Sequence, residues 1–279
     1  MIHGLETLVM LAVCFALCFL GKLAYGLFHP STNVDRELTA RDNFAFALQL
    51  GGYYLGILTA VGAPLTSPGS GDLRRDVVSV ALWGLLAIVL LNVASLIKRQ
   101  LALRSIDLAR EVVERGNVAA GIVLAGVHLA NALLILGALS GEGGVFPAAV
   151  FWLYAQALLA IALVGFMRLV RYDATAAILA DNRAVALMMA GVLVAMANIL
   201  RVAITGSFDG WIRGFVSATT YAIGGLVLLF AITWITDWLL LPGVTVHHEV
   251  VEQEIPNVGV GYIEGLFYVG VSLLVGWSL

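Results

Sequence analysis

The chain alternates long apolar runs with short segments rich in charge, glycine or proline. Eight of the runs have about the 20 residues that a helix needs to cross the hydrocarbon core of a bilayer. The expected membrane-spanning helices cover residues 5–28, 43–63, 76–97, 117–139, 145–170, 182–205, 211–241 and 257–278. The pattern therefore predicts an all-α integral membrane protein with eight transmembrane helices.

The connections between these runs are of two alternating kinds. Four of them carry many charged residues: 29–42, 98–116, 171–181 and 242–256. The other three are short and contain glycine, proline or serine: 64–75, 140–144 and 206–210. Because the two kinds alternate along a chain that crosses the membrane each time, all four charged connections should lie on one side.

The distribution of basic residues predicts which side this is. The charged connections and their flanks hold ten Lys and Arg residues, whereas the other side holds Arg74, Arg75 and Arg213. An excess of Lys and Arg marks the cytoplasmic side, so both termini should face outward. The acidic connection 242–256 has no Lys or Arg and weakens this count without reversing it.

A sequence repeat divides the chain into two similar halves. DNFAFALQLGG begins at Asp42 and DNRAVALMMAG at Asp181, an offset of 139 residues, while GNVAAGIVLAG at Gly116 and PNVGVGYIEG at Pro256 are offset by 140. We expect a first four-helix half over 1–141 and a second over 142–279, built from four two-helix hairpins. Because each hairpin has an even number of spans, all four should enter the membrane in the same orientation, in two parallel halves.

The repeated motif resembles the bacterial family called domain of unknown function 350. In each hairpin, an acidic or turn residue is followed by Asn and then by alternating small and apolar residues, most clearly in DNFAFALQLGG and DNRAVALMMAG. The resemblance implies an inner-membrane protein built from two-helix repeats, here four instead of the two of the small members. It implies no established catalytic residue, and it implies an association with stress operons and with spermidine-linked ATP-grasp enzymes.

Composition supports a membrane protein and excludes one large class of function. The chain is 61% hydrophobic and 12% charged, whereas soluble domains are usually about 45–50% apolar and about 25% charged. A net charge of −3 excludes a nucleic-acid binder that works through a basic surface. Cys14 and Cys18 lie in an apolar run and should pack as small hydrophobic residues.

Four asparagines form the first group of candidate site residues, because each stands where a charged connection becomes a membrane helix. They are Asn43, Asn117, Asn182 and Asn257. Asparagine is a favoured helix N-cap, since its side-chain oxygen accepts a hydrogen bond from the first N–H groups. The alternative is that four parallel helix starts bind an anion, which Asp42 and Asp181 would oppose. Nine residues after Asn, Gly52, Gly126 and Gly191 should form a packing seam.

Polar residues inside the expected spans form the second group: Glu264, His128, Asn131, Asn198 and Arg201. An ionisable group at Glu264 is costly in lipid and usually faces a protein interior or a water path. It either specifies packing as a protonated or paired carboxyl or lines a hydrated path with His128 and Asn131. Arg201 lies late in its helix and should extend toward the outer interface.

Two of the charged connections contain residues that could bind a partner or a metal. Residues 98–115 alternate apolar and charged positions, which predicts that the third helix continues beyond the membrane, either solvated or bound to a cytosolic or membrane partner. The segment around His247 and His248 matches no established zinc pattern, so we expect a solvated acidic loop and no metal.

The sequence favours a non-enzymatic scaffold or partner subunit in envelope or stress physiology. No phosphate-binding loop, nucleophile elbow or dinucleotide fingerprint is present, so we expect no enzyme activity and no cofactor. The alternative is a channel or transporter for a small ion or polyamine. The expected partners are the lipid bilayer and proteins, with no nucleic acid and with an oligomer left open.

Overall fold

A computed structural model describes residues 2–30, 32–66, 69–101, 107–141, 143–170, 172–240, 243 and 245–278. Within these residues, eight helices are long and apolar enough to cross a membrane. They are α1 (Ile2–Phe28), α2 (Phe44–Thr66), α3 (Leu73–Leu101), α5 (Val118–Ser140), α6 (Val145–Leu169), α8 (Arg183–Ile204), α9 (Trp211–Leu240) and α10 (Val258–Ser278). The prediction of an all-α protein with eight membrane-spanning helices is confirmed.

Each charged connection also contains a short helix, and of these only the one within 98–115 lies in a segment that the sequence predicts to be helical. These are η1 (Arg36–Ala40), α4 (Leu108–Arg115), α7 (Ala174–Leu179) and η2 (His248–Glu252), of which η1 and η2 are single π-helical turns. Local capping starts two of them, because Asp107 accepts a hydrogen bond from Arg110 N and Asp173 accepts one from Ala176 N. Each hairpin is therefore a long helix, a short helix and a second long helix.

One expectation about the connections is wrong. Residues 98–115 do not form one continuous extension of the third span, because Asp107 has a non-helical φ of −91° and ψ of 86°. Residues 102–106 lie outside the described part of the chain. Leu108 and Val112 of α4 are buried, and α4 packs against α5 and α2. In the connection 242–256, η2 buries Val250, whereas the acidic side chains of Glu252 and Glu254 are exposed.

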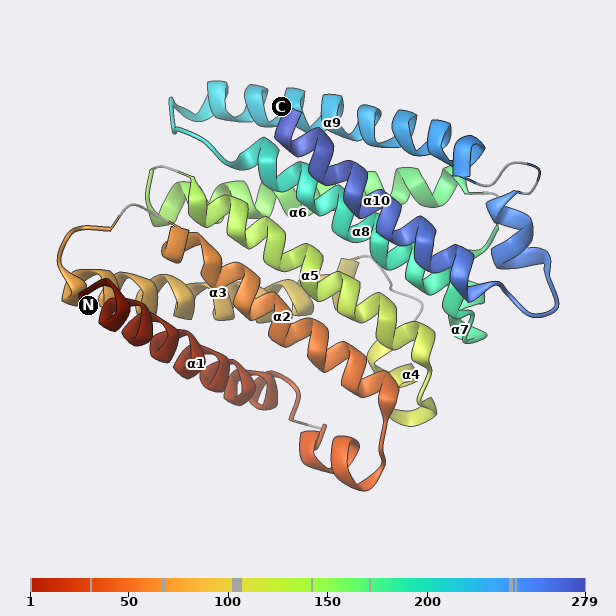
Figure 1. Cartoon of the computed structure of the whole chain (residues 1–279), viewed down its shortest axis with the longest axis horizontal. Helices are drawn as coiled ribbons and strands as arrows, with labels where there is room; N and C mark the ends of the chain where they lie inside the picture. Colours follow the sequence, from red (N-terminus) through yellow and green to blue (C-terminus); the bar gives the residue numbers. More distant parts are fainter. Residues whose placement is uncertain are drawn as a thin grey trace.

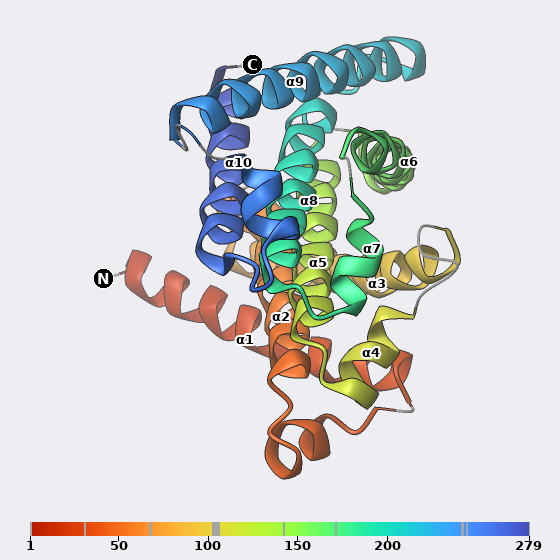
Figure 2. The ribbon, with the colours of Figure 1, turned by 90° about the vertical axis from the view of Figure 1, so that its right-hand side faces the viewer.

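The second helices of the four hairpins lie side by side in the order α2, α5, α8, α10 (Figure 1). We call this arrangement the helix row. The first helices pack against it: α3 contacts α2 and α5, α6 contacts α5 and α8, and α9 contacts α8 and α10. Seen after a quarter turn, α3 and α6 lie on one side of the row and α9 crosses its end (Figure 2).

Glycines at repeated positions allow the row helices to approach closely. A methyl group on Gly126, nine residues after Asn117, would lie 2.8 Å from Cα of Ala190 on α8. Methyl groups on Gly52 and Gly191 would overlap the backbones of Ala125 and Gly265 in the same way. The three glycines thus mediate three successive helix contacts. In a membrane, small residues stabilise helix pairs by permitting close van der Waals packing.

Candidate functional site

The four asparagines cap the four row helices. Their side-chain oxygens accept hydrogen bonds from backbone N–H groups three residues later, at Phe46, Ala120, Val185 and Val260, over 2.8 to 3.2 Å. Each bond satisfies an N–H group that has no partner within its helix. Capping, the first of the two sequence interpretations, accounts for the oxygen atom of each side chain.

The nitrogen atom of the same side chains links one hairpin to the next. Asn43 Nδ2 donates to Val112 O of α4 over 2.9 Å. Asn117 Nδ2 donates to Ile178 O of α7 over 2.9 Å, and Asn182 Nδ2 donates to Val250 O of η2 over 2.8 Å. These bonds could not be predicted from local sequence, because their partners lie 61 to 69 residues away. Each of these asparagines therefore joins two successive hairpins.

Asn257 stands at the end of the row and has a different partner. Its Nδ2 atom donates to the Glu249 carboxylate of its own hairpin over 2.9 Å. Asn257 is exposed, whereas Asn117 in the middle of the row is buried.

Asp181 joins the two halves of the chain at the same end of the bundle. Its Oδ1 atom accepts a hydrogen bond of 2.8 Å from Ala119 N in the first turn of α5. A carboxylate is favourable there because a helix N-terminus carries partial positive charge. From the sequence, Asp181 was expected only to oppose the binding of an anion, and its bond to α5 could not be predicted. With Asn117 bonded to Ala120 N, protein oxygens occupy two of the N–H groups that an anion would need on α5.

Polar groups within the spans bind neighbouring helices. Asn198 Nδ2 of α8 donates to Ser272 O and Oγ of α10 over 3.1 and 3.2 Å, and its oxygen accepts a 3.0 Å bond from Arg201 Nε. Asn131 of α5 accepts a bond of 3.0 Å from Gln156 of α6. Arg201 therefore binds within the protein, through Asn198.

A further polar cluster at the start of the row was not singled out from the sequence. Gln49 donates to Tyr25 Oη over 3.0 Å, Tyr53 Oη donates to Gly21 O over 3.0 Å, and Asn92 donates to Tyr53 Oη over 2.9 Å. These bonds tie α1, α2 and α3 together. The sequence feature that could have identified this cluster is the presence of polar residues such as Gln49 and Asn92 within apolar runs.

Glu264 does not lie with His128 and Asn131. His128 and Asn131 belong to α5, and the His128 ring packs edge-on against Tyr53 of α2, with centroids 5.4 Å apart. Glu264 belongs to α10, and α8 lies between α5 and α10 (Figure 1). The Glu264 side chain is only 4% exposed. Glu264 is therefore separated by α8 from His128 and Asn131, and the three residues of the expected hydrated path do not meet.

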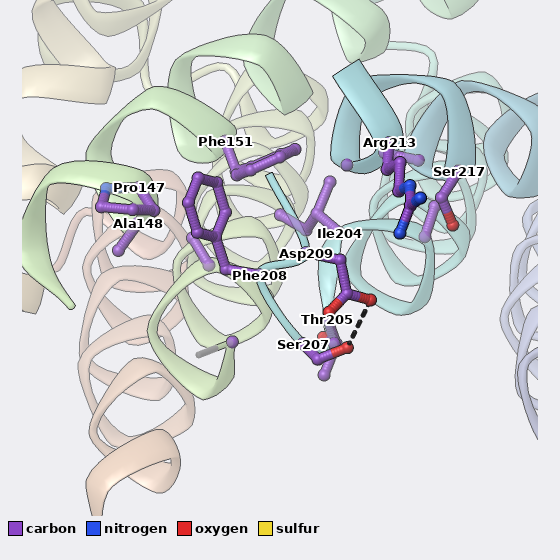
Figure 3. Close-up of a pocket in the computed structure, with 16 residues that line it drawn as sticks. Pro147, Ala148, Phe151, Ile204, Thr205, Ser207, Phe208, Asp209, Arg213 and Ser217 are labelled. Atoms are coloured by element: carbon purple, nitrogen blue, oxygen red, sulfur yellow. Dashed lines mark hydrogen bonds between the residues drawn. The ribbon is translucent and has the colours of Figure 1, made fainter. Parts of the chain in front are cut away.

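A cavity of about 220 Å³ lies at the end of the bundle opposite the asparagine caps. The lining residues labelled in Figure 3 belong to α6, α8, α9 and the segment between α8 and α9. Phe151, Phe208 and Pro147 form the apolar side of the cavity. Ser207 Oγ donates to Asp209 Oδ2 over 3.2 Å, and Arg213 also lines the cavity. None of the sequence candidates contributes to it.

At the end of the bundle with the asparagine caps, hydrogen bonding and burial shift the pKa values of two side chains. A hydrogen bond from His248, 3.0 Å from the Glu252 carboxylate, lowers the pKa of that carboxyl group, and His247 lies 3.2 Å from its other oxygen. Burial raises the pKa of Tyr172, between α6 and α7, to about 12. Among the residues that the structure describes, no three or more His, Cys, Asp or Glu side chains form a metal-binding group.

Comparison with known proteins gives one family. The model described as Domain of Unknown Function (DUF350) matches residues 1–139 and matches again over residues 142–279. No curated protein and no solved structure gives a match. The two family matches together span nearly the entire chain.

Proposed function

We propose that this chain, which belongs to the family Domain of Unknown Function (DUF350), is a non-enzymatic scaffold subunit of a bacterial inner membrane. Its role is to hold partner proteins at a fixed position in envelope or stress physiology. One observation carries the proposal: polar side chains inside the membrane bond neighbouring helices to each other. Asn198 with Ser272 and Asn131 with Gln156 are the clearest pairs.

The interlocked caps support a rigid platform at the charged end of the bundle. Three asparagines each fix a row helix and the short helix of the next hairpin. These bonds, buried at Asn117 and part-buried at Asn43 and Asn182, resist separation because breaking them leaves polar groups without partners. The short helices α4 and α7 are thereby held at fixed positions where a cytosolic partner could dock.

The second candidate function is transport of a small cation or polyamine, and Glu264 favours it. A carboxyl group that is 4% exposed within a span is costly and commonly marks an ion or proton pathway. Transport requires this carboxylate to meet a hydrated path. A scaffold requires only that the carboxyl group be accommodated in the packing.

Flux measurements on Glu264→Gln distinguish the two functions. In vesicles containing the purified protein, we expect neither the wild type nor Glu264→Gln to carry K⁺, protons or spermidine above protein-free vesicles. Glutamine keeps the shape and removes the charge, so the variant should also stay folded. Asn198→Ala is the control variant, because it weakens helix packing without removing a carboxyl group. It should lower the free energy of unfolding by about 0.6–1.7 kcal/mol per lost interhelical bond. Wild-type flux that disappears in folded Glu264→Gln would establish transport instead.

The proposed orientation places the charged connections in the cytoplasm, because most Lys and Arg residues lie there. Cysteines are introduced singly after replacement of Cys14 and Cys18. An impermeant thiol reagent added to spheroplasts should label cysteines introduced at Ser140 and Ser207. It should label cysteines introduced at Thr39 and Thr245 only after lysis. All four positions are exposed in the structure. The opposite labelling pattern would reverse the orientation.

A further inference from the structure

We propose that the protein binds a second copy of itself head to tail, with α10 of one copy packed against α2 of the next, so that the helix row continues from chain to chain. The three contacts inside the row define the geometry of this interface. The proposal follows from packing and goes beyond the scaffold function, because a transporter could assemble in the same way.

Each internal contact in the row pairs the same two helix faces. The front face of a row helix carries the residues two and nine positions after its asparagine. The back face of the following helix carries the residues four and eight positions after its own asparagine. Gly126 thus meets Ala190, and Gly191 meets Gly265. The arrangement is heterologous, so it leaves one unused face at each end of the row.

The unused back face of α2 has the small residues that the other back faces use for packing. Ala47 and Gly51 stand four and eight positions after Asn43, and Ala47 is exposed. A methyl group on Gly51 would meet no atom within 4 Å. On α5, by contrast, a methyl group on Gly121 would overlap Ala45 of α2. The small residues of the α2 back face therefore have no packing role within one chain.

The unused front face of α10 is complementary to this surface. Gly259, two positions after Asn257, is exposed, and a methyl group on Gly270 would meet no atom within 4 Å. Leu266 occupies the ninth position and is 53% exposed. In the continued row, Leu266 of one copy lies opposite Gly51 of the next, so the larger side chain faces the position with free space.

An independent observation at the charged end points to the same pairing. Within the chain, Asp181 accepts a hydrogen bond from Ala119 N across the junction of the two halves. Asp42 is its counterpart 139 residues earlier, and both have the left-handed backbone conformation, with φ of 48° and 57°. Non-glycine residues rarely adopt this conformation. In the continued row, the Asp42 carboxylate is placed to accept a hydrogen bond from Gly259 N of the other copy.

Disulfide cross-linking tests the pairing in native membranes. In a chain without Cys14 and Cys18, the combination Gly51→Cys with Leu266→Cys should form disulfide-linked oligomers on oxidation. A disulfide requires Cα atoms within about 7 Å. Gly51→Cys alone and Leu266→Cys alone should form no disulfide-linked oligomers, because neither face meets itself. Cross-linking of either single variant, or the absence of cross-linking in the pair, would overturn head-to-tail pairing.

Oligomer size in lipid nanodiscs provides the second test. Gly51→Leu should keep the fold, because the position is open, and should shift the protein from oligomer to monomer. Gly224→Leu is the matched control, since Gly224 of α9 is equally open but lies outside the row. Asp42→Ala should weaken association about tenfold through loss of a charged hydrogen bond. Unchanged oligomers in Gly51→Leu, or a monomeric wild type, would refute the proposal whatever the flux assays show.

Discussion

Gly191→Leu is expected to leave almost no folded protein. Gly191 lies on α8, where even a methyl group would overlap the backbone of Gly265 on α10. A backbone cannot rotate aside as a flexible side chain can. Extra methylene groups in a packed core typically cost about 1–3 kcal/mol, and leucine here separates two helices of the row. The loss should approach the roughly 5–15 kcal/mol that stabilises a typical protein.

The yield of monodisperse protein in mild detergent measures this effect. Gly165→Leu on α6 is the control, because a methyl group at Gly165 would meet nothing within 4 Å. Leucine at Gly165 should give the wild-type yield and unfolding temperature. Equal yields from the two variants would show that α8 and α10 do not pack through these glycines.

Asn117→Ala is expected to lower the free energy of unfolding by about 1.5–5 kcal/mol. Loss of an N-cap costs about 0.5–2 kcal/mol, and the buried carbonyl of Ile178 loses its donor, which costs about 1–3 kcal/mol more. Asn257→Ala is the matched variant at the row end. Because Asn257 is exposed and its amide nitrogen binds the Glu249 carboxylate of its own hairpin and not a buried carbonyl, its loss should cost little more than the capping energy.

Denaturant unfolding of the two variants separates these contributions. Asn117→Ser should fall between wild type and alanine, because serine can cap the helix but cannot donate to Ile178 O as the amide does. Equal destabilisation by Asn117→Ala and Asn257→Ala would argue that the asparagines act only as caps.

The long helices could be predicted because their signal is local. A run of about 20 apolar residues has few alternatives to a membrane helix, and the observed ends lie within a few residues of the expected ones. The short helices were missed because α7 has six residues and η1 and η2 have five each. Segments of that length carry too few positions to show an apolar periodicity.

At the candidate site, only the hydrogen bonds between residues close in sequence could be predicted. The capping bond of Asn117 joins residues three positions apart, whereas its bond to Ile178 O spans 61. Helical periodicity also placed Glu264 and His128 on equivalent faces of equivalent helices. It could not show that α8 separates those helices, because the order of helices in the row is decided by long-range packing.

Equivalent hairpins stand side by side in one row, and a single cross-link between α5 and α8 tests this arrangement. In a chain without Cys14 and Cys18, Asp181→Cys and Ala119→Cys should form a disulfide, because Asp181 Oδ1 lies 2.8 Å from Ala119 N. A protease site inserted between α5 and α6 then allows the halves to be cut apart. We expect the two fragments to stay joined after cleavage and to separate only on reduction. Fragments that separate without reductant, after complete oxidation, would contradict the row.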